Sequence, residues 1–94
     1  LMNTVIIEDE LLAAKDLQKL IQQLDTTIKV AAILPGLATA REWFTKNPEP
    51  DLLFMDIQLS DGVSFDLFNY VKLECPVIFT TAYNEYAIQA FKVN

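Results

Sequence analysis

The stretch that decides the fold is DLLFMDIQ (residues 51–58), an apolar run of strand length that ends in the carboxylate of Asp56. A second apolar run, VIIED (residues 5–9), ends in Glu8 and Asp9. If the two runs form adjacent parallel strands, the three carboxylates meet at the carboxyl ends, where open α/β sheets place their ligand crevice. Carboxylates that lie so close repel one another, so the pattern calls for a bound cation.

Length and composition indicate one folded domain. A chain of 94 residues forms a single core, and 52% apolar with 21% charged residues is typical of a globular protein rather than a disordered one. The net charge is −6, and the seven basic residues are scattered along the chain. Direct binding to nucleic acid is therefore not expected, because it needs clustered positive charge.

Cysteine usage and the N-terminus bear on the compartment. A single cysteine, Cys75, excludes an internal disulfide and a multi-cysteine zinc site. No basic segment followed by an apolar segment resembles a secretion signal, so we expect a cytoplasmic protein that does not bind membranes. Leu1 before Met2 indicates a cloning remnant ahead of the natural start.

Helices and strands alternate in the first half of the chain. Apolar residues at helical spacing from Ala13 to Leu24 predict a helix, and residues 28–34 form the next apolar strand. Pro35-Gly36 ends that strand, and a second helix with Ala40 and Trp43 on its inner side ends before Pro48. Strand 51–56 follows immediately.

The same alternation continues in the second half. Asp61-Gly62 predicts a turn, and Ser64 is placed to cap a third helix with Phe65 and Phe68 inside. Residues 77–80 form a fourth strand and residues 86–93 a fourth helix. Right-handed crossovers then predict an α/β fold with a doubly wound parallel sheet in the strand order 2-1-3-4.

These residues resemble the receiver domain of two-component response regulators, and the resemblance covers the whole chain. Glu8-Asp9 resembles the family's acidic pair, Asp56 its phosphoacceptor, and Thr81-Ala82 its switch threonine with the adjacent small residue. The segment FTTAYNEYA (79–87), followed by Ala90-Phe91, is similar in particular to receivers that carry a LytTR-type DNA-binding domain.

The resemblance implies a flavodoxin-like receiver fold and a set of functional residues. Asp56 would accept a phosphoryl group from a partner sensor histidine kinase, and Thr81 would supply the switch hydroxyl. Magnesium would be bound by Glu8, Asp9, Asp56 and the backbone carbonyl of Gln58, a ligand set of oxygens that suits this ion. Activation would bring a homodimer and would control an output domain that regulates transcription, with DNA bound only through that C-terminal domain.

Two further expectations follow from the resemblance. Receivers catalyse part of their own phosphorylation and its reversal, yet we would class this chain as a signalling domain rather than an enzyme. The family also has a fifth strand, which bears a lysine and an aromatic switch residue, and a fifth helix. The chain stops at Asn94 before these elements, so residues 1–94 are expected to be a C-terminally truncated receiver.

Other readings of the same residues remain open. Asp56 is a possible turn cap, Glu8-Asp9 a possible cap of the first helix, and Thr81 a possible ordinary strand end. A degenerate receiver that acts as a phosphorylation-independent dimerisation or interaction module would keep the fold without the chemistry. Hydrolases with an aspartate nucleophile place a second aspartate two residues later, where this chain has Gln58.

Overall fold

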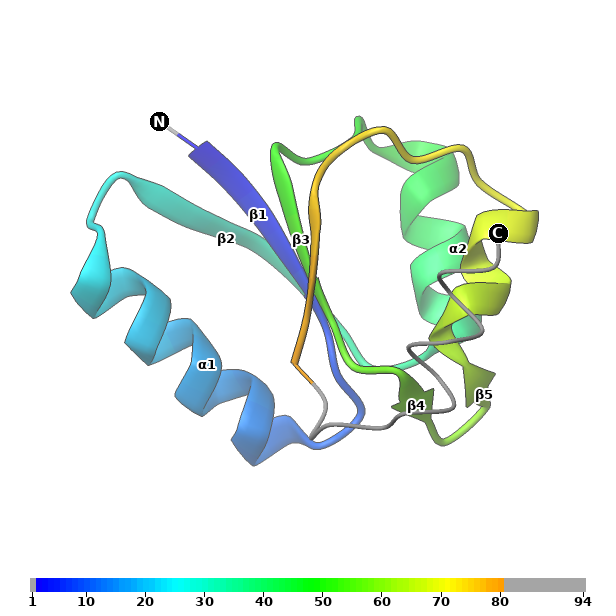
Figure 1. The fold of residues 1–94 in the computed structure, drawn as a ribbon, viewed down its shortest axis with the longest axis horizontal. Coiled ribbons are helices and arrows are strands. Elements are labelled where there is room, and N and C mark those ends of the chain that lie inside the picture. Colours follow the sequence, from blue (N-terminus) through cyan, green and yellow to red (C-terminus); the bar gives the residue numbers. More distant parts are fainter. Residues whose placement is uncertain (1, 81–94) are drawn as a thin grey trace.

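Four parallel strands form the central sheet of the computed structural model, which describes residues 2–80 (Figure 1). They are β1 (Met2–Ile7), β2 (Ile28–Leu34), β3 (Leu52–Met55) and β6 (Val77–Phe79), in the order β2-β1-β3-β6. Every neighbouring pair is parallel. The predicted order 2-1-3-4 is confirmed, because β6 is the fourth strand of this sheet in sequence.

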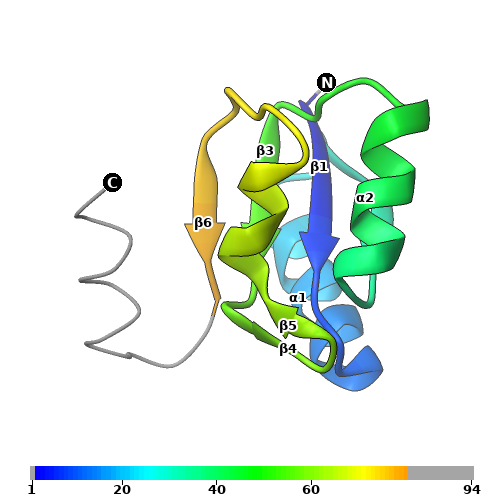
Figure 2. The same cartoon turned by 90° about the vertical axis from the view of Figure 1, so that its right-hand side faces the viewer.

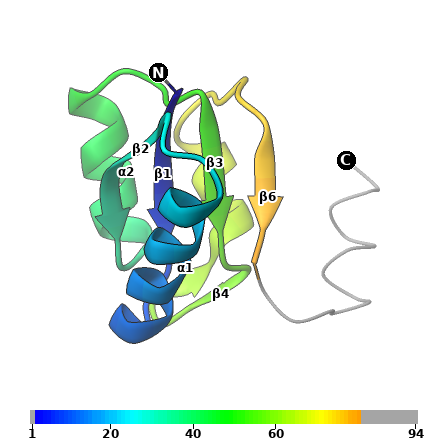
Figure 3. The ribbon, with the colours of Figure 1, turned by 90° about the vertical axis from the view of Figure 1, so that its left-hand side faces the viewer.

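Helices cover both faces of the sheet. Helix α2 (Leu37–Lys46) and the 3-10 helix η1 (Ser64–Asn69) lie on one face, as Figure 2 shows. Helix α1 (Leu11–Leu24) lies on the other face (Figure 3). Within residues 2–80, no helix has both the length and the apolar character needed to cross a bilayer.

The two-sided core explains why the strands are continuously apolar. Side chains alternate along a strand, so Val5 and Ile7 of β1 join the core on the α2 side, whereas Ile6 joins the core on the α1 side. Leu53 and Met55 of β3 likewise face α2 and are fully buried. Both central strands are therefore fixed from both faces, and their ends are held in register.

The segment between β3 and β6 differs from the prediction. Strands β4 (Gln58–Leu59) and β5 (Gly62–Val63) form a small antiparallel hairpin. Its turn is Ser60-Asp61, one residue before the predicted Asp61-Gly62. The third helix is a 3-10 helix, and its N-cap is Val63, so the expectation that Ser64 caps it is wrong. The Ser64 hydroxyl is buried and has no hydrogen-bond partner within the described residues.

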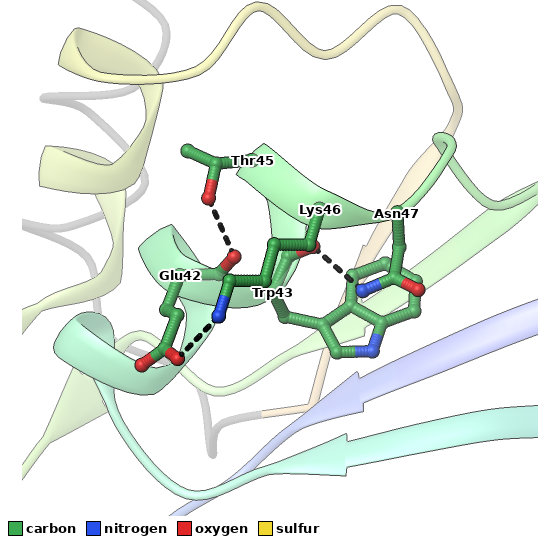
Figure 4. Close-up of polar contacts among 5 residues, drawn as sticks. All are labelled: Glu42, Trp43, Thr45, Lys46 and Asn47. Atoms are coloured by element: carbon green, nitrogen blue, oxygen red, sulfur yellow. Dashed lines mark hydrogen bonds and ion pairs between the residues drawn. The ribbon is translucent and has the colours of Figure 1, made fainter.

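Helix α2 is closed locally at its C-terminus (Figure 4). The Asn47 side-chain amide donates to the carbonyl of Trp43 at 2.9 Å, and Lys46 pairs with Glu42 one turn earlier at 3.0 Å. The Thr45 hydroxyl also donates to the carbonyl of Glu42 at 2.7 Å, so side chains hydrogen-bond to carbonyls of the last turns, while the ion pair links side chains of successive turns. At the N-terminus, Gly36 occupies the N-cap position and has no side chain to cap the helix, so the first amides of α2 need a partner from elsewhere.

Candidate functional site

The backbone brings the ends of β1 and β3 together. Ile7 pairs with Met55 in the parallel ladder, and the Asp56 N–H donates to the carbonyl of Ile7 at 2.9 Å. The Glu8 N–H donates to the carbonyl of Leu34 at 3.0 Å, which ties the other side of β1 to β2. The residues that follow the two strands are thus held side by side by main-chain hydrogen bonds.

Three carboxylates gather at this edge of the sheet. Oxygen atoms of Glu8, Asp9 and Asp56 lie within 4.8 Å of one another, and all three side chains are half-buried. The predicted meeting of the three acids is confirmed by this geometry. Their roles as metal ligands and phosphoacceptor remain predictions. We call these three residues the acidic cluster.

The electrostatics of the acidic cluster are unfavourable without a cation. Burial raises the pKa of Glu8 to about 7, and the charge of Asp56 and hydrogen bonds with Asp9 and Asp56 act in the same direction. The backbone amide of Glu10, which donates to Glu8 Oε2 at 3.1 Å, opposes this rise. One oxygen of the Glu8 carboxylate is therefore hydrogen-bonded to Glu10, the residue just before α1. The Glu10 side chain itself does not cap α1.

The donor set fits a hard divalent cation. Among residues 2–80 the ion pairs lie in α2 and after η1, so no lysine or arginine of this range pairs with the acidic cluster. An all-oxygen cluster of carboxylates that lacks a basic partner suits Mg²⁺, which prefers oxygen ligands and retains several waters. Water can reach the half-buried oxygens and complete such a coordination shell.

The predicted site also includes Gln58 and Thr81. Gln58 begins β4, two residues after Asp56, and its side chain is exposed. Its predicted role concerns the backbone carbonyl and stays a prediction. Thr81, the predicted switch hydroxyl, lies outside the described residues, as does the predicted helix over 86–93. The last described residue, Thr80, donates its N–H to the carbonyl of Met55 at 3.1 Å, beside Asp56.

Sequence reasoning missed the part played by Asp61, which it treated as a turn and surface residue. Its two carboxylate oxygens accept hydrogen bonds from the backbone amides of Leu37 and Ala38 at 2.8 and 3.1 Å. These are the first two residues of α2, 24 and 23 positions earlier in the chain. The only local signal was that Gly36 cannot cap the helix it precedes.

Comparison with known proteins identifies relatives over almost the whole chain. The family profile described as response regulator receiver domain matches residues 4–94. Two proteins named sensory transduction protein LytT are 34% identical in Bacillus anthracis, over 100% of this chain, and 38% identical in Enterococcus faecalis, over 99% of it. The chain spans 39% of the length of each of these relatives.

Solved structures agree with the fold. The receiver domain of the response regulator PhyR from Erythrobacter litoralis is 33% identical, with a TM-score of 0.73 over 97% of this chain and 70% of that one. PhyR from Brucella abortus is 32% identical, with a TM-score of 0.71 over 83% of this chain and 32% of its own.

Proposed function

This chain belongs to the response regulator receiver domain family, and on that premise we propose that Asp56 accepts a phosphoryl group in a Mg²⁺-dependent reaction. The observation that supports the proposal most strongly is the acidic cluster, which places a carboxylate at a strand end beside two further acids. Asp56 is half-buried and therefore reachable from solvent.

The proposed reaction is an in-line phosphoryl transfer. A carboxylate oxygen of Asp56 forms a bond to phosphorus while the bond between phosphorus and a histidine nitrogen of the partner kinase breaks, and the electron pair of that bond stays on the imidazole. The product is an aspartyl phosphate. Because this chain contains no histidine, the phosphohistidine must belong to another protein or domain.

The acidic cluster has a defined part in this reaction. Glu8, Asp9, Asp56 and the Gln58 carbonyl would hold Mg²⁺, which when bound offsets the negative charge shared by the Asp56 carboxylate and the incoming phosphoryl oxygens. Without a cation, the charges of Glu8 and Asp9 would repel a phosphoryl donor from Asp56. The requirement for a divalent ion thus follows from the residues themselves.

The signal would pass from the aspartyl phosphate to an output. By family resemblance, the Thr81 hydroxyl donates a hydrogen bond to a phosphoryl oxygen, and the phosphorylated state favours an active conformation that dimerises. The names of the LytT relatives, sensory transduction proteins, support a sensor histidine kinase as partner. The resemblance of residues 79–87 to receivers with a LytTR-type domain supports a DNA-binding output domain.

Intact-mass measurement tests the proposal. The protein is exposed to a small acyl-phosphate donor with and without Mg²⁺, together with Asp56→Asn and Asp51→Asn variants. We expect one added phosphoryl group in the wild type and in Asp51→Asn, and none in Asp56→Asn or without Mg²⁺. Asp51 is a matched control because it flanks the same strand, β3, at the opposite end.

Failure of the wild type to gain mass would refute the phosphoacceptor assignment. The protein would then be better described as a phosphorylation-independent interaction module, the alternative that keeps the receiver fold. Gain of mass in Asp56→Asn would place the modification on another residue and would equally refute the assignment.

A further inference from the structure

Both glycines of the chain lie at one contact, where the loop after Asp56 meets the start of α2. A Cβ atom on Gly36 would lie 3.0 Å from each carboxylate oxygen of Asp61. A Cβ atom on Gly62 would lie 2.8 Å from Leu37 Cδ1, and Gly62 also has a φ of +142° that side chains rarely adopt. A side chain at Gly36 would therefore have to displace the Asp61 carboxylate, and one at Gly62 would meet Leu37 and strain the backbone.

Asp61 makes the polar part of this contact. Its carboxylate oxygens accept the N–H groups of Leu37 and Ala38, which have no acceptor within the helix because they lie in its first turn. These two hydrogen bonds lower the pKa of Asp61, so the carboxylate is charged at neutral pH and suits the positive end of the helix dipole. The N-terminus of α2 is thus capped by a residue that is distant in sequence, whereas its C-terminus is capped by the neighbouring Asn47 (Figure 4).

The same loop leads directly from the acidic cluster. Residues 57–63 start one position after Asp56 and contain Gln58. At its base the loop is closed by the Ser64 N–H, which donates to the carbonyl of Ile57 at 2.8 Å. Its hairpin has only two residues in each strand. A hairpin this short is not stable by itself, so its position depends on contacts with the rest of the domain. Leu59 is buried in the core, and Asp61 binds α2 at the tip.

We propose that Asp61 is a positioning residue for the cation site: by binding the first turn of α2, it holds loop 57–63 and the Gln58 carbonyl in place beside the acidic cluster. This inference rests on the proposed function, because it takes the Gln58 carbonyl as a ligand of Mg²⁺. Asp61 itself does not touch the cation. Its effect passes through the backbone of β4, in the way that outer residues orient metal ligands.

The test compares Asp61→Ala with Asp51→Ala. Both carboxylates are exposed and accept backbone amides, since Asp51 Oδ2 accepts the Asn3 N–H at 2.8 Å, but Asp51 lies at the far end of β3. Mg²⁺ affinity is measured by titration of the metal-free protein, and hydrogen exchange is followed for the amides of residues 57–63. We expect Asp61→Ala to weaken Mg²⁺ binding about 10-fold or more and to speed exchange in the loop, and Asp51→Ala to do neither.

A second variant separates position from charge and guards against misfolding. Gly36→Ala keeps the Asp61 carboxylate, and the extended φ of −163° at Gly36 accepts alanine, but the new methyl group displaces the Asp61 oxygens. It should weaken Mg²⁺ binding in the same direction as Asp61→Ala, by a smaller factor. Asp61→Asn, which retains one acceptor oxygen, should lie between the wild type and Asp61→Ala.

Two results would overturn the proposal in distinguishable ways. If the wild type binds Mg²⁺ and gains a phosphoryl group, while Asp61→Ala and Gly36→Ala bind Mg²⁺ with unchanged affinity, Asp61 is only a helix cap and the proposed function stands. If the wild type neither binds Mg²⁺ nor gains mass, the proposed function fails and the positioning role fails with it.

Discussion

At the amino ends of the strands, Asp51 and Glu49 accept backbone N–H groups, whereas at the carboxyl ends Glu8, Asp9 and Asp56 face one another. Glu49 accepts the amides of Glu74 and Cys75, and these hydrogen bonds lower its pKa. Burial and neighbouring acids raise the pKa of Glu8 instead. Carboxylates that accept hydrogen bonds from backbone amides stabilise the fold. Carboxylates that face each other are instead available to bind a cation.

The largest expected difference between the two ends is in Mg²⁺ affinity. Asp9→Asn removes a charged oxygen from the acidic cluster and should weaken Mg²⁺ binding more than the roughly 10–100-fold typical of losing an outer-sphere partner. Asp51→Asn should leave the affinity unchanged, because Asp51 lies at the opposite end of β3. Titration calorimetry of the two variants checks this, and equal affinities would show that the acidic cluster is not the cation site.

The second prediction concerns stability at the carboxyl ends. The folded pKa of Glu8 is about 7, above its ordinary 4.5, so its contribution to stability is fully present below about pH 4.5 and is lost as pH rises through 7. Glu8→Gln should therefore raise the stability of the metal-free protein at pH 8, by on the order of 1 kcal/mol after solvent screening.

Thermal denaturation of Glu8→Gln and wild type across pH 4 to 8 gives the comparison. The two curves should converge toward pH 4, below the ordinary pKa of 4.5, where Glu8 is mostly protonated in both the folded and unfolded states. Added Mg²⁺ should stabilise the wild type more than Glu8→Gln. A variant less stable than the wild type at pH 8 without metal would contradict the repulsion described here.

The third prediction concerns Glu49 at the amino ends of the strands, where the pH dependence of stability has the opposite sign. Because hydrogen bonds from the Glu74 and Cys75 amides lower the pKa of Glu49, its stabilising contribution is present above about pH 4.5 and is lost as pH falls through the lower folded pKa. Glu49→Gln should lower the melting temperature at pH 7, and the difference should shrink in acid. A melting temperature independent of this substitution at pH 7 would show that the Glu49 contacts contribute nothing.

The smallest effect is expected at Cys75, whose backbone N–H donates to Glu49. Burial, with Glu49 nearby, raises the pKa of the Cys75 thiol to about 11, so only about one molecule in a thousand carries the thiolate at pH 8. Alkylation by iodoacetamide should be slow in the folded protein and modestly faster in Glu49→Gln. Rapid alkylation of the folded wild type, at the rate of an exposed thiol, would contradict this environment.

Local pattern was enough to predict the main sheet. Residues 28–34 were expected as a strand and form β2 with the same bounds, and the helix expected from apolar residues between Ala13 and Leu24 is α1. Apolar runs and helical spacing are properties of neighbouring residues, and right-handed crossovers then restrict the strand order. The same logic placed Glu8, Asp9 and Asp56 at one edge, since the pair Glu8-Asp9 follows β1 and Asp56 follows β3.

The loop after Asp56 was less accessible to such reasoning. The spacing of Phe65 and Phe68 was interpreted as the inner side of a helix, but η1 is a 3-10 helix whose fully buried apolar side chain is Leu67. The β4–β5 hairpin is too short to produce a visible alternation. Ser64 begins η1 with its hydroxyl buried, a placement that depends on packing rather than on capping preference.

The sequence by itself therefore determined which residues end the central strands and so which carboxylates meet, because parallel strands place their carboxyl ends at one edge. Only the tertiary structure decided how those carboxylates are held and what surrounds them. Asp61 and the first turn of α2 are 24 residues apart, and nothing in their local patterns relates them. Their contact exists because the fold brings the start of α2, which has no local cap, next to the Asp61 carboxylate. Gly36 and Gly62 leave the space for this close approach.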